Sequence, residues 1–340
     1  MPPVSLDATY SLGQHLSGVG VYSHEVLYGL AAAHPEARFQ WCYRPHRFLS
    51  SFRESLPGNC RRRLLQEPFR PSGLFHGLNQ RLPRVRFRHA VTTFHDLFVL
   101  TGDYSTPEFR RRFGEQARLA AAESARIICV SAFTARQVEQ LLGVERERLR
   151  VIHHGVRLAP AEPRQREEIV LHVGAIQRRK NVERLVEAFE TLEPDWRLVL
   201  VGSAGYGSER IFRRIEESRR RENIHVTGWV APDELAAWYA RASILAFPSF
   251  DEGFGIPVLE AMAAGVPVVT SNGSALPEVA GEAALLIDPA RSEQLAEALR
   301  RLASDAELRA RLVRRGRLRA AQFTWGEAVQ KTWSVYNEIR

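Results

Sequence analysis

The sequence predicts an α/β protein of two domains, each built around a parallel β-sheet. Three observations support this fold class. Short apolar runs that end in Gly, Ser or Pro alternate with stretches of helical periodicity, which is typical of strands buried on both faces of a sheet. This alternation occurs in both halves of the chain. The 340 residues are too many for one ordinary core, but they suit two domains of common size.

The pattern is most regular from residue 168 onward. Amphipathic stretches predict helices, the first of which is expected to be capped by Asn181, whose side chain can accept a hydrogen bond from a free backbone N–H. The apolar runs predict strands at 168–174, 197–202, 223–228, 243–249 and 266–271. The intervening helices are predicted at 181–192, near 208–221, at 232–240 and at 258–265. Strands this apolar, separated by helices, predict a sheet covered on both faces.

The first half repeats the theme less clearly. Residues 4–8 predict a strand and residues 20–33 a helix, whereas the pattern blurs between 44 and 88, which we expect to be rich in loops. Further strands are predicted at 89–97, 125–131 and 148–155. Residues 157–167 contain two prolines and several charges and predict a linker.

The last stretch, residues 323–339, predicts an amphipathic helix. The expected organisation is therefore an N-terminal domain at 1–156, a C-terminal domain at 168–322 and a terminal helix at 323–340.

Composition restricts the class of protein. About 45% of the residues are hydrophobic and 25% are charged, as in ordinary globular proteins. The first residues carry neither a basic nor an apolar segment, and no apolar run is long enough to span a bilayer, so we expect neither a signal peptide nor a membrane helix. Cys42, Cys60 and Cys129 have no metal-ligand spacing and predict buried side chains in a reducing, cytoplasmic compartment.

The net charge of +8 arises in the first part of the chain. Residues 1–155 hold 21 Lys and Arg against 13 Asp and Glu, whereas residues 156–340 hold 26 of each. Three readings stay open: a solvated arginine-rich face, a surface for anionic lipid headgroups on the inner face of the membrane, or a nucleic-acid site. The excess is carried by arginine-rich runs near Phe87, Phe109 and Phe113, at residues 61–63, 81–88 and 110–112.

Residues 247–269, FPSFDEGFGIPVLEAMAAGVPVV, are the most informative stretch of the sequence. A predicted strand leads into a glycine-bearing loop and then into a helix with Pro257 at its start, so the helix N-terminus offers an anion site. Gly253 and Gly255 allow close approach of the backbone to a ligand. Glu252 and Glu260 could each bind a vicinal diol on either side of a diphosphate. The alternative is a capping carboxylate and an ordinary surface Glu.

Lys180 is unusual in this composition. The chain has 45 Arg but only two Lys, Lys180 and Lys331. A retained Lys suggests a need for a compact ammonium rather than a planar guanidinium. Lys180 follows Arg179 in a predicted turn before a helix, which predicts contact with phosphate rather than a solvated basic turn.

These motifs resemble the family 4 retaining glycosyltransferases of the GT-B fold. The family signature, two glutamates separated by seven residues in an EGFG-P-LEAMA-G-PV setting, stands at Glu252 and Glu260. The resemblance covers nearly the whole chain and continues through 171–189, 198–207, 226–249 and 271–289, and in the first half through 17–27, 92–97 and 130–138. Within the family, the chain looks most similar to bacterial mannosyltransferases of surface-polysaccharide assembly.

The resemblance implies two Rossmann-like domains whose parallel sheets face each other across a cleft, with the terminal helix crossing back to the first domain. It implies a nucleotide-sugar donor, GDP- or UDP-linked with GDP-mannose favoured, and a saccharide or lipid-linked acceptor. It assigns catalytic roles to His95 and Glu252 and weaker acceptor roles to His76 and Asn79. The residues it assigns to donor binding are Gly18, Gly20, Arg179, Lys180, Val230, Gly253, Phe254, Gly255, Ile256 and Glu260.

One departure from the family pattern concerns the leaving group. Many members carry an Arg directly after the glycine that is Gly174 here, and this chain has Ala175. Arg179 and Lys180 are therefore expected to meet the charge of the leaving nucleotide alone, together with helix amides.

Several other functions are disfavoured. The glycines at 18 and 20 fail the dinucleotide fingerprint because Ser23 replaces the third Gly or Ala. No DxD sequence resembles a divalent-metal clamp, so we expect neither metal nor cofactor. A nucleotide-sugar epimerase or a phosphorylase of the same fold is the nearest enzymatic alternative, and a nucleic-acid-binding protein is a distant one.

Overall fold

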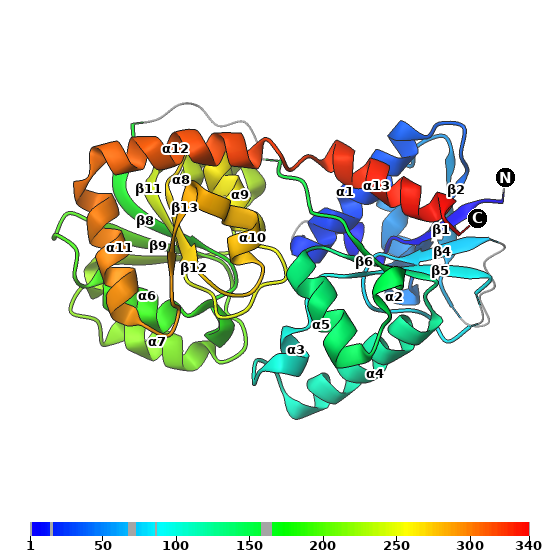
Figure 1. The fold of residues 1–340 in the computed structure, drawn as a ribbon, viewed down its shortest axis with the longest axis horizontal. Coiled ribbons are helices and arrows are strands. Elements are labelled where there is room, and N and C mark those ends of the chain that lie inside the picture. Colours follow the sequence, from blue (N-terminus) through cyan, green and yellow to red (C-terminus); the bar gives the residue numbers. More distant parts are fainter. Residues whose placement is uncertain (1, 14–15, 67–72, 86, 158–164, 340) are drawn as a thin grey trace. The chain divides into compact units, whose positions relative to one another are not determined.

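The computed structural model describes residues 2–13, 16–66, 73–85, 87–157 and 165–339. The chain forms two compact units (Figure 1). Unit 1 consists of Met1–Thr101, Thr106–Gly155 and Thr324–Arg340, and unit 2 consists of Gly102–Ser105 and Val156–Phe323. The chain thus enters unit 2 after Gly155 and returns to unit 1 after Phe323. The predicted linker at 157–167 falls mostly outside the described residues.

Unit 1 contains one parallel sheet in the order β3-β2-β1-β4-β5-β6-β7. Its strands are β1 (Val4–Asp7), β2 (Phe39–Tyr43), β3 (Cys60–Leu64), β4 (Leu74–Gly77), β5 (His89–Phe94), β6 (Arg126–Cys129) and β7 (Leu149–Val151). The strands predicted near 4–8, 89–97, 125–131 and 148–155 are confirmed. The loop-rich prediction for 44–88 is wrong in part, because β3 and β4 lie there.

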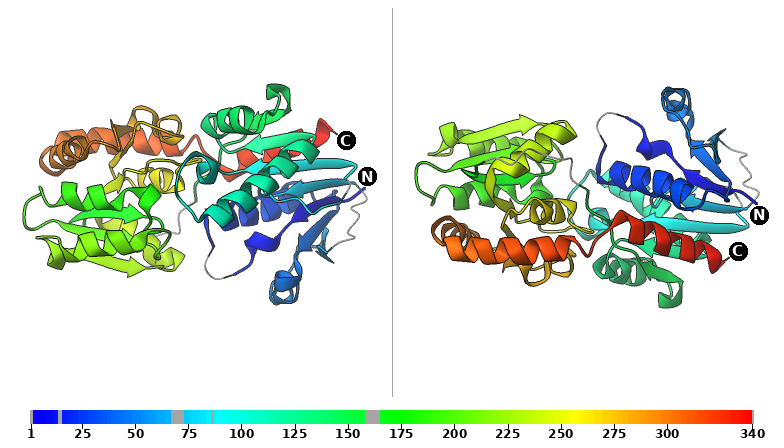
Figure 2. Two further views of the ribbon diagram at one scale, coloured as in Figure 1. Left: turned by 90° about the horizontal axis from the view of Figure 1, so that it is seen from below. Right: turned by 90° about the horizontal axis from the view of Figure 1, so that it is seen from above.

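Helices cover both faces of the unit 1 sheet (Figure 2). They are α1 (Gly18–Ala33), α2 (Pro45–Phe48), α3 (Phe98–Thr101), α4 (Pro107–Glu123), α5 (Ala132–Leu142) and α13 (Trp325–Asn337), with 3₁₀ turns η1 (Thr9–Ser11), η2 (Leu49–Arg53) and η3 (Arg146–Arg148). Helices α1 and α13 pack together over one hydrophobic core, which includes Trp41 and Tyr336. Helices α4 and α5 cover a second core, which includes Phe75 and Phe94. The helices predicted at 20–33 and 323–339 are confirmed.

Unit 2 contains a second parallel sheet in the order β10-β9-β8-β11-β12-β13. Its strands are β8 (Glu167–Val173), β9 (Arg197–Val201), β10 (Ile224–Gly228), β11 (Ala242–Phe247), β12 (Val268–Ser271) and β13 (Ala284–Ile287). All five strands predicted here are present. The predicted α/β fold with two parallel sheets is therefore confirmed.

The helices of unit 2 also cover both faces of its sheet (Figure 1). They are α6 (Val182–Phe189), α7 (Ser208–Glu216), α8 (Pro232–Arg241), α9 (Ile256–Ala263), α10 (Leu276–Ala280), α11 (Ser292–Ser304) and α12 (Ala306–Ala320), with 3₁₀ turns η4 (Arg178–Lys180), η5 (Arg221–Asn223) and η6 (Gly281–Ala283). Helices α6, α7 and α11 pack together, as do α9, α10 and α12. The four helices predicted from the sequence are present, and Pro257 takes the second position of α9 rather than the first.

Two further sequence expectations concern cysteines and membrane helices. Cys42, Cys60 and Cys129 are all buried and unpaired, as predicted. Within the described residues, no helix combines the length and the apolar character that crossing a bilayer requires.

The packing of Gly155 against Trp325 generates a prediction about stability. Gly155→Ala would put a β-carbon into the backbone nitrogen of Trp325. We expect a loss of about 1–3 kcal/mol in the free energy of unfolding, measured by urea denaturation, because neither backbone segment can yield. Gly326→Ala is the matched control, since a β-carbon there meets nothing within 4 Å and should stabilise α13 by about 0.4–1 kcal/mol. Equal stabilities of the two variants would contradict this account.

Candidate active site

The candidate residues of unit 2 lie at one edge of its sheet. Because the strands are parallel, their carboxyl ends meet there. The strand order reverses between β8 and β11, which places the loops after these two strands on either side of the crevice where such sheets bind ligands. The first loop carries Arg179 and Lys180, and the second carries Glu252.

Glu252 forms ion pairs with two buried cations. Its carboxylate accepts a hydrogen bond from the Lys180 ammonium at 2.6 Å and lies 3.0 Å from the Arg179 guanidinium. All three residues are less than a tenth exposed. Burial alone would raise the pKa of Glu252, but Arg179 and Lys180 outweigh it and hold the pKa at about 2. Two buried cations thus face the one carboxylate of Glu252, and such a pair of cations suits an anionic ligand.

Two glycines allow the close packing of the backbone beside Lys180. Gly174 and Gly202 end β8 and β9 with φ values of 144° and 146°, which L side chains rarely adopt. A β-carbon at Gly202 would overlap the carbonyl oxygen of Gly174, and one at Gly174 would meet Cε of Lys180 at 3.2 Å. The Lys180 ammonium also lies 4.6 Å from the ring centre of Phe247, a cation–π distance.

The side chain of Asn181 connects its own loop, after β8, to the loops that follow β11 and β13. It precedes α6, as predicted, but its side chain does not cap the helix. Its amide instead donates to the carbonyl oxygens of Pro248 and Pro289 at 3.1 and 2.8 Å. The backbone N–H of Phe250 donates to the carbonyl of Arg179 at 2.9 Å. The predicted N-cap position of Asn181 is therefore confirmed, but its left-handed conformation (φ 59°) turns the side-chain amide toward the neighbouring loops instead of the helix.

The loop after Glu252 leads directly into α9. Gly253, Phe254 and Gly255 are buried, and Gly255 adopts a φ of 117° at the N-cap position, where no side chain caps the helix. No side chain of the N-cap residue caps α9, and the positive end of its dipole suits an anion. Ile256, the first residue of α9, is half-buried.

Glu260 lies inside α9 and is hydrogen-bonded to Tyr239 of α8. The Tyr239 hydroxyl donates to Oε2 of Glu260 at 2.8 Å, and the ring has no exposed surface. Burial raises the pKa of Glu260 to about 7, and the hydrogen bond from Tyr239 limits the rise. Glu252 and Glu260 thus have opposite electrostatic environments although they belong to one sequence motif.

In unit 1, His95 directly follows β5 and is a buried, neutral imidazole. Its Nε2 donates to the carbonyl of Leu78 at 2.9 Å, which leaves Nδ1 as the ring acceptor. Burial lowers the pKa of His95 to about 4. The ring packs edge-on against Tyr22 at 4.7 Å and stacks on His154 at 5.5 Å.

His76 is in the core rather than at the surface. It has no exposed area, and its ring nitrogens are hydrogen-bonded to Thr93 at 2.9 Å and to Tyr336 at 2.6 Å. This position gives His76 a structural role between β5 and α13, and we do not keep it as an acceptor contact. Asn79 follows β4, is also buried, and accepts a hydrogen bond from the Arg81 N–H at 2.9 Å.

Gly18 and Gly20 lie in the first turn of α1, and their role in donor binding stays a prediction. Gly18 is exposed, and the Ser17 hydroxyl accepts from the N–H of Gly20 at 3.3 Å. A β-carbon at Gly20 would meet the carbonyl oxygen of Tyr10 at 2.9 Å, so only glycine fits there. In unit 2, Val230 is buried shortly after the end of β10.

The sequence did not identify Tyr239 or Ser249 as parts of the site. Tyr239 looks like any apolar residue of an amphipathic helix, and only its contact with Glu260 distinguishes it. Ser249 is fully buried, and its hydroxyl group helps to lower the pKa of Glu252. The sequence offered one indication of this role, which is the position of Ser249 two residues after β11 and close to Glu252.

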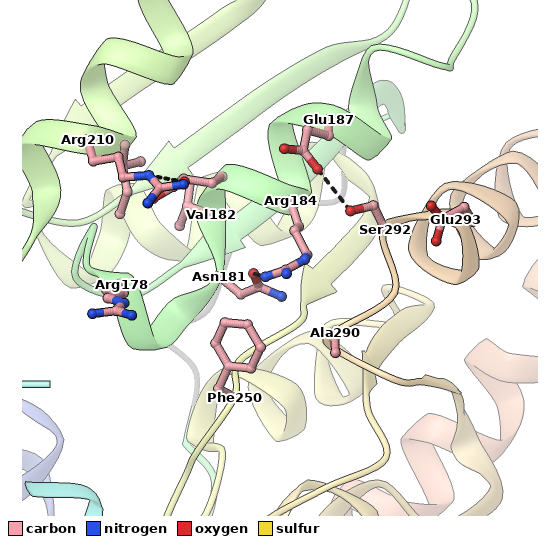
Figure 3. Close-up of a pocket in the computed structure, with 12 residues that line it drawn as sticks. Arg178, Asn181, Val182, Arg184, Glu187, Arg210, Phe250, Ala290, Ser292 and Glu293 are labelled. Atoms are coloured by element: carbon pink, nitrogen blue, oxygen red, sulfur yellow. Dashed lines mark hydrogen bonds and ion pairs between the residues drawn. The ribbon is translucent and has the colours of Figure 1, made fainter. Parts of the chain in front are cut away.

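A pocket of about 530 Å³ lies beside this site in unit 2 (Figure 3). Arg184 reaches over the Phe250 ring at 5.5 Å and donates to Asn181, while Ser292 donates to Glu187 at 2.9 Å. Its lining includes the arginines Arg178, Arg184 and Arg210 and the glutamates Glu183, Glu187 and Glu293, and Arg210 forms an ion pair with Glu183 at 2.9 Å. None of the predicted site residues lines it. Across the described residues, no three His, Cys, Asp or Glu side chains group as a metal site would.

Two family models match the chain. The model for "Glycosyltransferase Family 4" matches residues 9–159, and that for "Glycosyl transferases group 1" matches residues 159–319. The chain is 32% identical over 281 residues to the O-antigen chain mannosyltransferase B of Escherichia coli, covering 77% of this chain and 74% of that protein.

Solved structures share the fold at low sequence identity. Sucrose-phosphate synthase from Thermosynechococcus elongatus aligns with a TM-score of 0.79 and 22% identity, covering 100% of this chain and 99% of that one. HepE of Anabaena, in complex with UDP-glucose, aligns with a TM-score of 0.76 and 18% identity, covering 99% and 100%. These likenesses agree with the two parallel sheets described above.

The ion cluster generates a prediction about acid stability. The lowered pKa of Glu252 means that its stabilising effect is complete above its ordinary value of 4.5 and is lost as the pH falls toward about 2. We expect wild type to lose about 3 kcal/mol more than Glu252→Gln over this window. Urea unfolding at a series of pH values measures the difference, with the exposed Glu234→Gln as control. A difference that stays constant with pH would contradict the ion pairs.

Proposed function

This chain belongs to the family 4 glycosyltransferases of the GT-B fold, and we propose that it transfers a hexosyl group from a nucleotide diphosphate to a saccharide or lipid-linked acceptor in cell-surface glycan synthesis. Mannose from GDP-mannose is the favoured donor, on the likeness to the mannosyltransferase of Escherichia coli. A UDP-linked sugar is the alternative, because HepE, which shares the fold, is solved with UDP-glucose.

The observation that carries the proposal is the pairing of two buried cations with one carboxylate. The diphosphate takes the place of the Glu252 carboxylate in the ion pairs with Arg179 and Lys180. The carboxylate is then released to accept hydrogen bonds from hydroxyls of the transferred sugar. Binding of the diphosphate and positioning of the sugar are thereby coupled, since one cannot happen fully without the other.

Glu260 binds the ribose in this scheme. Ionised, it accepts hydrogen bonds from the two ribose hydroxyls, each worth roughly 1.5–3 kcal/mol. The Tyr239 hydroxyl holds one of its oxygens in place at 2.8 Å and favours the ionised form. Gly253, Phe254, Gly255 and Ile256 line the diphosphate with the start of α9, while Val230 and the Gly18–Gly20 turn complete the donor contacts.

The reaction proceeds with retention of configuration and without a metal. The bond between the anomeric carbon and the diphosphate oxygen breaks, and the acceptor oxygen attacks from the same face. The acceptor proton passes to the leaving phosphate, whose charge Arg179 and Lys180 stabilise. His95, neutral in its buried position, is the catalytic residue contributed by unit 1. Asn79 is the remaining acceptor candidate.

The test is isothermal titration of the protein with GDP-mannose, UDP-glucose, UDP-GlcNAc and dTDP-rhamnose in the presence of EDTA. Tight binding of one donor, lost in Lys180→Ala, supports the proposal and names the nucleotide. Transfer of that sugar to an acceptor separates a transferase from an epimerase, and independence from inorganic phosphate separates it from a phosphorylase. Failure of every donor to bind would overturn the proposal.

Substitutions of Glu252 and Glu260 should have different effects on nucleotide binding and on transfer. Glu252→Gln removes a competitor for the two cations, so we expect the nucleoside diphosphate to bind at least as tightly as to wild type while transfer falls by roughly a hundredfold or more. Glu260→Ala should weaken the nucleoside diphosphate by roughly tenfold or more through the lost ribose contacts. Titration calorimetry and a transfer assay measure both quantities. Wild-type transfer in both variants would show that the site is assigned wrongly.

Donor affinity should also depend on pH through Glu260. Because burial sets its pKa at about 7 and the ribose needs the ionised form, affinity for the nucleotide sugar should rise as the pH increases through 7. Glu260→Gln should abolish this dependence. Tyr239→Phe removes the hydrogen bond that lowers the pKa, so the midpoint should move upward and affinity at pH 7 should fall.

The matched control for Tyr239→Phe is Tyr336→Phe, which also loses one buried hydrogen bond, to His76 in unit 1. Its affinity for the nucleotide sugar should follow the wild-type pH profile. If both phenylalanine variants had the same pH dependence of nucleotide-sugar affinity, Tyr239 would not act through Glu260.

A further inference from the structure

The pocket beside the ion cluster continues into a second pocket of unit 2. The first has a volume of about 530 Å³ and includes Phe250 in its lining, and the second has a volume of about 480 Å³ and includes Tyr206. The two pockets share Arg178, Glu183 and Arg210, so they adjoin. We call them together the unit 2 groove. No residue with a role in the proposed transfer reaction lines it, so that reaction leaves the groove unexplained.

The backbone fixes the loop that carries Tyr206. The N–H of Arg178 donates to the carbonyl of Tyr206 at 3.2 Å, and the N–H of Gly205 donates to the carbonyl of Ile176 at 2.8 Å. These bonds tie the loop after β9 to the loop after β8. The second pocket is therefore held by paired backbone and not only by exposed side chains.

Each pocket of the unit 2 groove contains one aromatic ring. Tyr206 is 40% exposed, and Phe250 is half-buried. Figure 3 shows the Arg184 guanidinium above the Phe250 ring, at 5.5 Å from its centre. A sugar ring can bury its apolar C–H face against an aromatic ring while its hydroxyls reach polar groups at the edge. Two rings in adjoining pockets suit a ligand of more than one sugar.

The charged side chains of the unit 2 groove are of both signs. Its lining holds three arginines and four glutamates, which are Arg178, Arg184, Arg210, Glu183, Glu187, Glu209 and Glu293. The ion cluster differs, because two cations face one carboxylate there. A phosphate would therefore find no excess of positive charge in the groove. A hydroxyl group both donates and accepts, so a neutral polyol can use the guanidinium N–H groups and the carboxylate oxygens together.

We propose that the unit 2 groove binds a neutral oligosaccharide, with one sugar ring against Phe250 and another against Tyr206. The volume of each pocket lies in the range of small-molecule sites. This ligand class follows from the lining of the groove alone.

The use of the groove rests on the proposed function. The groove and the ion cluster are built from the same two loops, which follow β8 and β11. A growing glycan held in the groove would stay beside the donor site, which raises the effective concentration of its end as an acceptor.

The experiment is isothermal titration of the full chain with mannotriose, maltotriose and chitotriose, at low and high salt and without nucleotide. We expect at least one of these neutral sugars to bind with an affinity that salt changes little. Tyr206→Ala and Phe250→Ala should each weaken this binding roughly tenfold or more. Tyr206→Phe keeps the ring and should bind like wild type. Phe109→Ala is the matched control, because it removes a ring of unit 1 that is also 40% exposed.

Titration of the same variants with the nucleotide sugar separates the groove from the donor site. Tyr206→Ala should bind the donor like wild type while it loses the oligosaccharide. Oligosaccharide binding by a protein that binds no donor would support the groove and contradict only the proposed function. Three outcomes would overturn the groove: no binding of any trisaccharide, wild-type binding by both alanine variants, or displacement of the sugar by inorganic phosphate.

Discussion

Glu252 sits between two buried cations, and most features of the unit 2 site follow from that cluster. Removing one partner would leave an uncompensated buried charge, which is among the costliest defects in a protein interior. Several neighbouring features keep Lys180 2.6 Å from the carboxylate. They are the glycines with positive φ after β8 and β9, the side-chain amide of Asn181 and the ring of Phe247 beside the ammonium. The site is thus held ready by polar contacts that an anionic ligand can replace.

The two carboxylates of the motif illustrate how environment decides chemistry. Glu252 remains ionised at any ordinary pH because two cations face it, whereas Glu260 has one hydroxyl partner and titrates near neutrality. Seven intervening residues separate them, but the first lies in a loop and the second in α9. Their proposed roles, one toward the sugar and one toward the ribose, match this difference.

Much of the fold and of the unit 2 site could be predicted from the sequence, because these features depend on local sequence patterns. The apolar runs gave five of the six strands of unit 2, and the glycine-bearing loop before Glu260 marked the site. Strands β2, β3, β4 and β13 escaped prediction, and in β3 the arginines of an edge strand hide the apolar pattern. Tyr239, the actual bonding of Asn181 and the burial of His76 depend on contacts between residues far apart in the chain, which periodicity does not contain.

The path of the chain determines the order in which the two units can complete their cores during synthesis. Unit 2 is nearly one continuous stretch, but the core of unit 1 includes Val329, Val335 and Tyr336 from the last helix. During synthesis the sheet of unit 1 therefore emerges first, but the core of unit 1 is completed last, only after α13 has left the ribosome. Until then the surface of α1 that α13 covers is exposed, whereas unit 2 already has its whole core. A chain truncated before Trp325 would lack part of the first unit, although every strand of both sheets would be present.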